Sequence, residues 1–95
     1  MAAPKVSIVF EQVREVARQF KQKSQESMTM RTQLDNAAKG IQSQWEGAAS
    51  QRFYTDFETW KQQMQNHVEL LNNIGLELER IAAILQQADD AAAGR

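Results

Sequence analysis

His67 is the one histidine of the chain and the first residue to consider for catalysis or metal binding. A zinc site would need a second ligand three or four residues away. The side chains at those distances are Gln63, Met64, Leu70 and Leu71, none of which is a good zinc ligand. No Ser or Cys nucleophile accompanies His67 in a recognisable motif. The sequence therefore predicts a protein with no enzymatic activity, no metal site and no cofactor.

The composition narrows the class of protein further. The chain has 95 residues, one proline, no cysteine and a net charge of -1. This length allows one small domain, and the absence of cysteine excludes disulfides and thiolate chemistry. A nearly neutral chain is a poor ligand for nucleic-acid phosphates, and no stretch approaches the ~20 apolar residues that span a bilayer. The first residues also lack the apolar core of a cleavable signal peptide. We expect a protein that serves as a partner for another protein, with no small-molecule substrate.

Two apolar seams with heptad spacing run through the chain. In each half, apolar residues recur at alternating steps of three and four, which keeps one stripe of a helix facing a partner helix. Val9 and Ala37 belong to the first seam. The residues predicted to form the hairpin and dimer seams are Val13, Val16, Phe20, Met30, Leu34 and Ile41 in the first half, and Phe53, Phe57, Trp60, Met64, His67, Leu71, Ile74, Leu78 and Ile81 in the second.

Three polar residues interrupt these seams. Lys23 and Ser27 lie in the first seam, where polar residues set register and partner choice or mark the end of tight contact. His67 lies in the second, and we interpret it as a core or boundary histidine hydrogen-bonded across a bundle. The alternative is a pH switch, in which protonation of His67 weakens a dimer interface.

The seams predict an all-α fold, an antiparallel helical hairpin. The first helix is expected over about 8–43, with Ser7 as its N-cap, the turn over about 44–48, and the second helix over about 49–88, followed by a flexible tail. Gly47 is expected to close the first helix in the left-handed conformation, and Gly75 to lie off the seam. A single hairpin would leave its large seam residues partly exposed to solvent. We therefore predict a single domain, 1–95, that dimerises into a four-helix bundle.

The tripeptide Trp45-Glu46-Gly47 at the predicted turn, in a hairpin of this length, resembles the WXG family of type VII secretion substrates, the small Esx-type, early-secreted-antigen-like proteins of bacteria. The resemblance implies a non-enzymatic substrate, effector or export partner that dimerises in the cytoplasm and is then secreted to the cell surface or medium. It also implies that Trp45 and Gly47 form the turn motif and partner contact. The implied partners are a second copy, which we favour, or a second WXG-type protein, and the secretion ATPase, with the membrane crossed only in transit. The alternative is an intracellular helical adaptor or coiled-coil assembly module with no export role.

The same family carries an export signal, Tyr-x-x-x-Asp/Glu, just after the second helix. The matching segment here runs from Leu85 to Asp89, with leucine in place of tyrosine. Either Leu85 is an accepted variant or a secretion partner supplies the tyrosine; Leu85 is also a seam position. A literal match, from Tyr54 to Glu58, lies at the start of the second helix, and we interpret it as ordinary helix surface.

Overall fold

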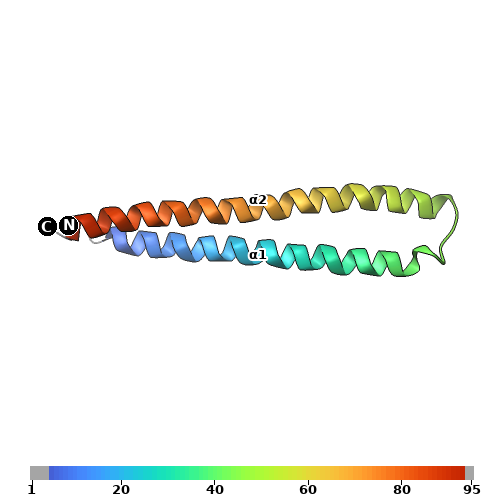
Figure 1. Ribbon diagram of the computed structural model, residues 1–95, viewed down its shortest axis with the longest axis horizontal. Helices are drawn as coiled ribbons and strands as arrows, with labels where there is room; N and C mark the ends of the chain where they lie inside the picture. The colour runs from blue at the N-terminus through green and yellow to red at the C-terminus, as the bar shows by residue number, and fades with distance from the viewer. Residues whose placement is uncertain (1–4, 94–95) are drawn as a thin grey trace. The chain divides into compact units, whose positions relative to one another are not determined.

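The computed structural model describes residues 5–93 and the side chains of residues 9–92. Two helices, α1 (Lys5–Gln42) and α2 (Ala48–Ala93), are joined by a short turn over 43–47 (Figure 1). No strand occurs within this described range. The predicted all-α hairpin fold is confirmed, while the single domain and the dimer remain predictions.

The helix ends differ from the predicted ones by several residues. α1 begins at Lys5, so Ser7 lies within the helix and does not cap it, contrary to our prediction. α2 continues through Ala93, so the flexible tail predicted after residue 88 is also wrong for residues 89–93. Three consecutive alanines at 91–93 explain the continuation, because alanine has the highest helix propensity.

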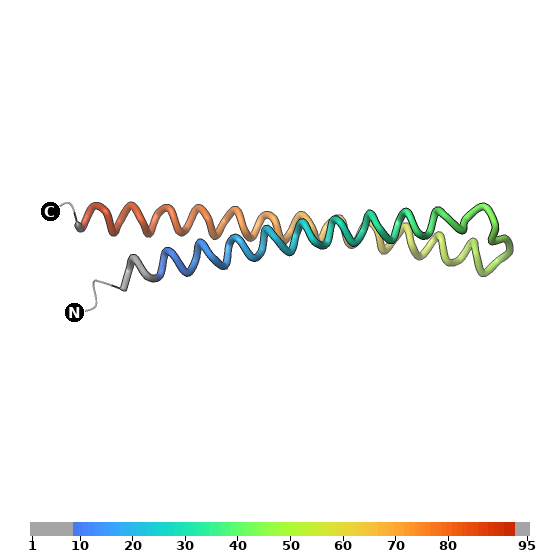
Figure 2. The backbone as a smooth tube through the Cα atoms, turned by 90° about the horizontal axis from the view of Figure 1, so that it is seen from below, coloured from blue at the N-terminus to red at the C-terminus, as the bar shows by residue number. Residues whose placement is uncertain are grey.

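The helices form two compact units, each containing one segment of α1 and one of α2. Of the described residues, the terminal unit comprises 5–23 and 71–93, and the turn unit comprises 24–70. Within each unit the two segments run in opposite directions (Figure 2). Each unit is therefore a small antiparallel helix pair.

In the terminal unit the two backbones approach closely at Gly75. A Cβ atom built on this glycine would lie 3.1 Å from the carbonyl oxygen of Ala17 and 2.5 Å from Cγ of Lys21. Ala17 and Ala82 are fully buried in the same unit, and Phe10 is also buried. Gly75 thus lies in the middle of the helix–helix contact and, as predicted, off the seam of large apolar residues.

In the turn unit, polar side chains join the two helices. The Ser24 hydroxyl, 3% exposed, donates to the Val68 carbonyl oxygen at 2.8 Å. The Tyr54 hydroxyl donates to the Ala38 carbonyl oxygen at 2.6 Å. Both acceptors are backbone atoms of the opposite helix, so these bonds fix which residues of α1 and α2 lie at the same level.

The middle of the contact is a line of mostly small residues with a spacing of seven. On α1 the buried members are Phe10, Ala17, Ser24 and Ala38, and on α2 they are Val68, Gly75 and Ala82. The predicted large seam residues flank this line. Small side chains occupy it because they let two helices approach until their backbones nearly touch.

Candidate partner-binding surface

The large seam residues lie on one side of the helix pair in each unit. On α1 each of them comes three or six residues after a position of the contact line. Leu34 and Ala37, for example, come three and six residues after Arg31, which lies seven residues after Ser24. On α2, Phe57 and Trp60 follow Tyr54 in the same way. These steps correspond to rotations of roughly -50° and -100° from the contact line at about 3.5 residues per turn. α2 faces α1 from the opposite direction, and because it is antiparallel, the same step along its sequence turns in the opposite sense when both helices are viewed from one end. The two reversals cancel, so the large seam residues of α1 and those of α2 lie on the same side of the pair.

We call this side the apolar face. It carries Val9, Val13, Val16, Phe20, Met30, Leu34, Ala37 and Ile41 on α1, and Phe53, Phe57, Trp60, Met64, Leu71, Ile74, Leu78, Ile81 and Leu85 on α2. In the turn unit its residues, with Ala38, line an apolar groove of about 410 Å³ between the helices.

Several large side chains of this groove are exposed to solvent. Leu34 is 44% exposed, Ile41 is 50% exposed and Phe53 is 37% exposed, and Met30 nearby is 46% exposed. Single exposed leucines are common on protein surfaces, but a contiguous apolar groove of this kind marks a binding surface. The apolar face is therefore the candidate partner-binding surface.

An aromatic ladder forms the α2 wall of the groove. The rings of Phe53 and Phe57 stack with centroids 5.6 Å apart and an interplanar angle of 11°. Those of Phe57 and Trp60 stack at 5.3 Å and 12°. The ladder follows from the sequence, since residues three or four apart share one helix face. Stacked rings have little rotamer freedom to lose, and they give the groove a rigid wall.

The turn joins this wall to the end of α1. Gly47 has a φ of 111°, the left-handed region predicted for it, which side chains other than glycine adopt only with strain. The Trp45 ring, half-buried, lies 5.5 Å from Phe53 and 6.1 Å from Tyr54, centroid to centroid. The Ser50 hydroxyl donates to the Trp45 carbonyl oxygen at 2.9 Å. The tripeptide thus has a defined shape at the open end of the groove.

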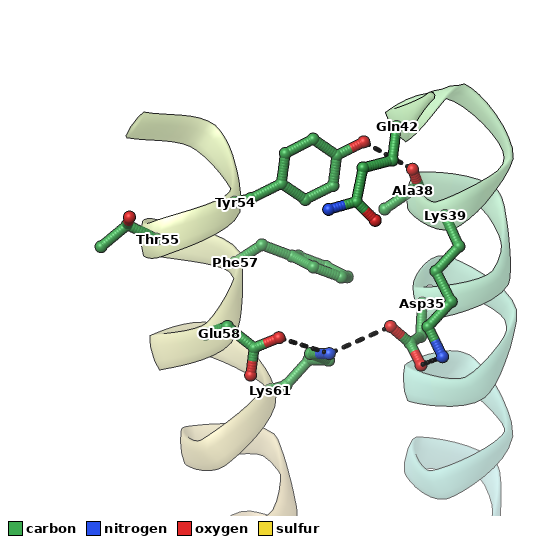
Figure 3. Close-up of a pocket in the computed structure, with 9 residues that line it drawn as sticks. All are labelled: Asp35, Ala38, Lys39, Gln42, Tyr54, Thr55, Phe57, Glu58 and Lys61. Carbon is green, nitrogen blue, oxygen red and sulfur yellow. Dashed lines mark hydrogen bonds and ion pairs between the residues drawn. The ribbon is translucent and has the colours of Figure 1, made fainter. Parts of the chain in front are cut away.

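The other side of each helix pair carries charged and polar contacts between the helices, and in the terminal unit it also carries Leu76, which is 48% exposed. In the terminal unit, Arg14 donates to Gln86 at 2.7 Å, and Lys21 pairs with Glu79 at 3.0 Å. In the turn unit, a charged cleft of about 310 Å³ lies between the helices on this side (Figure 3). The two sides thus differ in chemistry, and several charges of the polar side are paired within the chain.

Lys61 is the centre of the charged cleft. Its ammonium lies 2.9 Å from Glu58 and 3.1 Å from Asp35, and Asp35 also pairs with Lys39 at 3.2 Å (Figure 3). Hydrogen bonds from Lys61 and then Lys39 hold the pKa of the Asp35 carboxyl below its usual value. Hydrogen bonds to Glu58 and then Asp35 raise the pKa of Lys61. The ion pair between Asp35 and Lys61 favours the charged form of both groups and links α1 to α2.

The remaining predicted residues fall in different places. His67 is exposed, and Leu85 and Asp89 are half-buried on α2 in the terminal unit. Tyr54 is half-buried and bonded to α1, so its interpretation as ordinary helix surface was wrong. Its spacing of seven from Lys61, and of seven more from Val68, is the signal that places it on the contact line.

Residues 5–93 contain neither a metal site nor a membrane-spanning segment. Within that range no group of three or more histidine, cysteine, aspartate or glutamate side chains is placed to hold a metal ion. Neither α1 nor α2, as far as they are described, has a segment long and apolar enough to cross a membrane. The apolar face with its turn is the strongest candidate site of the part described.

Comparison with known proteins connects this surface to a family. The chain is 27% identical over 84 residues to protein YukE of Bacillus subtilis strain 168, a match covering 88% of this chain and 87% of YukE. Its structure is similar to that of EsxA from Geobacillus thermodenitrificans, with a TM-score of 0.84 and 30% identity, over 90% of this chain and 94% of EsxA. It is also similar to the secreted protein EsxB of Bacillus anthracis strain Sterne, with a TM-score of 0.78 and 29% identity, over 84% of this chain and 91% of EsxB. The sequence profile of the family described as proteins of 100 residues with WXG matches residues 5–90. The chain therefore belongs to the WXG100 family.

Proposed function

We propose that this chain is a non-enzymatic protein exported by a bacterial type VII secretion system, as a dimeric substrate, effector or export partner. The observation that carries the proposal is the apolar groove of the turn unit, with Leu34, Ile41 and Phe53 exposed along it in a WXG100 protein. The description of the similar EsxB as a secreted protein supports the export half of the proposal.

The dimer follows from the imbalance between the two sides of the helix pair. Several charges of the polar side are paired within the chain, whereas the apolar face leaves large side chains in water. Pairing two such faces makes a four-helix bundle, the arrangement in which each apolar stripe gains a second neighbour. The single hairpin domain over residues 1–95 is the unit that pairs. Its partner is a second copy or another WXG-type protein.

Export requires contacts that the secretion machinery reads. We assign this role to the turn motif, Trp45 and Gly47, and to the pair Leu85 and Asp89 on α2. Leu85 and Asp89 are four residues apart and therefore share one helix face, with the carboxylate one turn beyond the leucine. The secretion ATPase is the component that would engage this face.

Export of the chain from a bacterium with a type VII system tests the proposal. Trp45→Ala and Asp89→Ala are expected to reduce the protein in the culture supernatant by at least about tenfold, the effect of losing roughly 1.4 kcal/mol of recognition. Their neighbours supply matched controls, since Glu46→Ala and Asp90→Ala remove exposed carboxylates beside the same positions. Immunoblots of supernatant and cells, with a cytoplasmic marker for lysis, measure the ratio.

Folding is followed in the same strains by circular dichroism of each purified variant. Loss of export with helix content retained is the expected result. If wild-type protein stays in the cells, the chain is an intracellular adaptor and the proposal fails. If export survives Trp45→Ala while the helices unfold, the turn has a structural role alone.

A further inference from the structure

We propose that Ser50 is a positioning residue for export, and that its hydroxyl holds Trp45 in the place where the secretion machinery meets the turn. The inference rests on the proposed function of the turn motif and adds a residue to it. The recognised element then extends from Trp45 into the first two turns of α2 and does not end at Gly47.

Trp45 lies in the part of the turn that follows the last backbone hydrogen bond of α1 and precedes the first one of α2. The Gln44 N–H donates to the Ile41 carbonyl oxygen at 3.1 Å and closes α1. The Gln51 N–H donates to the Gly47 carbonyl oxygen at 3.1 Å and opens α2. The position of Trp45 therefore depends on contacts other than the regular hydrogen bonds of the two helices.

Ser50 supplies the contact with the Trp45 backbone. It lies seven residues before Phe57, where the seam of large apolar residues on α2 would continue, yet it is a serine with an exposed fraction of 6%. Burying a hydroxyl is costly unless it is hydrogen-bonded, and the Trp45 carbonyl oxygen accepts from it at 2.9 Å. The bond explains a serine at this position, because alanine, which occupies the two preceding positions, is the better helix former.

The next turn of α2 supplies the contact with the indole ring. Phe53 and Tyr54 come three and four residues after Ser50, so the three side chains lie on one face of α2. The Trp45 ring centroid lies 5.5 Å from that of Phe53 and 6.1 Å from that of Tyr54. Ring contacts tolerate tilting and sliding, whereas a hydrogen bond to the carbonyl fixes the backbone from which the ring projects. Ser50 thus determines where on this face the indole lies.

A tryptophan that is held in place but partly exposed is suited to recognition by another protein. Trp45 is half-buried, so part of its ring is open to a partner. A partner that binds a preformed ring position spends less affinity on ordering it. Without the Ser50 hydroxyl, the apparent affinity of the secretion machinery for the turn falls in proportion to the fraction of molecules in which Trp45 keeps its place.

Export of a double-mutant set tests the inference. Ser50→Ala is expected to reduce the protein in the culture supernatant by at least about threefold, the change in population that the loss of one hydrogen bond produces. In a Trp45→Ala background the same substitution is expected to have no further effect, because no indole remains to be positioned. Thr59→Ala is the matched control and is expected to be exported like the wild type, since the exposed Thr59 hydroxyl bonds at 3.5 Å to Thr55 of its own helix.

Fluorine NMR of protein labelled with 5-fluorotryptophan gives a readout at Trp45 itself. The chain has two tryptophans, and Trp60→Phe identifies their resonances. In Ser50→Ala the Trp45 resonance is expected to move toward its position in the urea-unfolded chain, while circular dichroism shows that the helices are retained. The Thr59→Ala control is expected to leave the Trp45 resonance unchanged.

The outcomes separate this inference from the proposed function. If Trp45→Ala reduces export and Ser50→Ala reduces it equally with and without the indole, Ser50 acts on the helix alone, and the inference is overturned while the proposed function stands. Normal export of Ser50→Ala with an unmoved Trp45 resonance also overturns the inference alone. Normal export of Trp45→Ala contradicts the role proposed for the turn, and the inference fails with it.

Discussion

The terminal unit and the turn unit join the same two helices in different ways. In the terminal unit the contact is made by the smallest side chains, with Ala17 and Ala82 fully buried around Gly75. In the turn unit it is made by donors that reach backbone carbonyls of the opposite helix, from Ser24, Arg31 and Tyr54. The buried part of the terminal contact depends on shape, with the Arg14–Gln86 and Lys21–Glu79 contacts at its edge, whereas the buried part of the turn contact depends on hydrogen-bond geometry.

The difference shows how a helix pair without a large internal core is specified. Close approach fixes the distance between two helices but tolerates sliding, because a row of small residues looks alike at each turn. A hydrogen bond to one particular carbonyl fixes the axial register, because the next carbonyl on that face lies about 5 Å away along the helix. The two units are thus specified by different properties, close approach in one and hydrogen bonds to carbonyls in the other. Substitutions that remove each property test the comparison.

Filling the close approach in the terminal unit has the largest expected effect. Gly75→Val places two methyl groups where even a Cβ atom would lie 3.1 Å from the Ala17 carbonyl oxygen. Overpacking of this kind costs about 1–3 kcal/mol. The free energy of unfolding in urea, at one fixed protein concentration, measures the loss.

Gly40→Val is the matched control. A Cβ atom on Gly40 has no atom within 4 Å, so this variant is expected to change the free energy of unfolding by less than about 0.5 kcal/mol. Equal losses in the two variants would refute close approach as the reason for a glycine at position 75.

The Gly75 contact also shows where prediction from sequence stops. The heptad spacing of large residues predicted two helices, their turn and the apolar face. It did not predict the contact line, because alanine, glycine and serine contribute little to an apolar pattern. Ala17 and Ala82 are indistinguishable in sequence from good helix formers on a solvated face. The contact line is indicated only by small residues that recur at multiples of seven. These are Ala17, Ser24 and Ala38 in α1, and Gly75 and Ala82 in α2.

Removing the Tyr54 hydroxyl is the corresponding test of the turn unit and has a smaller expected effect. Tyr54→Phe keeps the ring contacts with Trp45 and Phe53 and deletes the 2.6 Å hydrogen bond to the Ala38 carbonyl. The expected loss is about 0.5–1.5 kcal/mol, measured by urea unfolding, with faster amide hydrogen exchange in the last turns of α1.

Thr55→Val serves as its control, because the Thr55 hydroxyl bonds at 3.0 Å to Gln51 of its own helix and crosses to no other. Hydrogen exchange at the end of α1 should not change in this variant. A similar increase in both would refute the assignment of Tyr54 as a link between the helices.

Tyr54 illustrates a second limit of sequence reasoning. Tyr54 matches the tyrosine of the export pattern, but its position on the contact line explains its role, which is the hydrogen bond to α1. The predicted export pair, Leu85 and Asp89, was chosen by the same pattern at a different place and still depends on the export assay. Short sequence motifs recur by chance in helices. A structure is needed to distinguish a buried occurrence from an exposed one.

The smallest expected effect concerns the pH dependence of the two units. The lowered pKa of Asp35 means that the unfolded chain binds more protons than the folded chain as the pH falls through the carboxyl range. The stability that Asp35 contributes is therefore present above about pH 4 and is lost at lower pH. Asp35→Asn should therefore reduce the loss of stability at acid pH.

Glu77, whose pKa Arg80 lowers, is the control in the terminal unit. Its ion pair lies within one helix and is more exposed. Glu77→Gln should reduce the loss less, because solvent screens exposed pairs. Urea unfolding between pH 2 and pH 7 measures both slopes, and a larger change for Glu77→Gln would contradict the view that the cross-helix pair of Asp35 contributes more than an exposed pair within one helix.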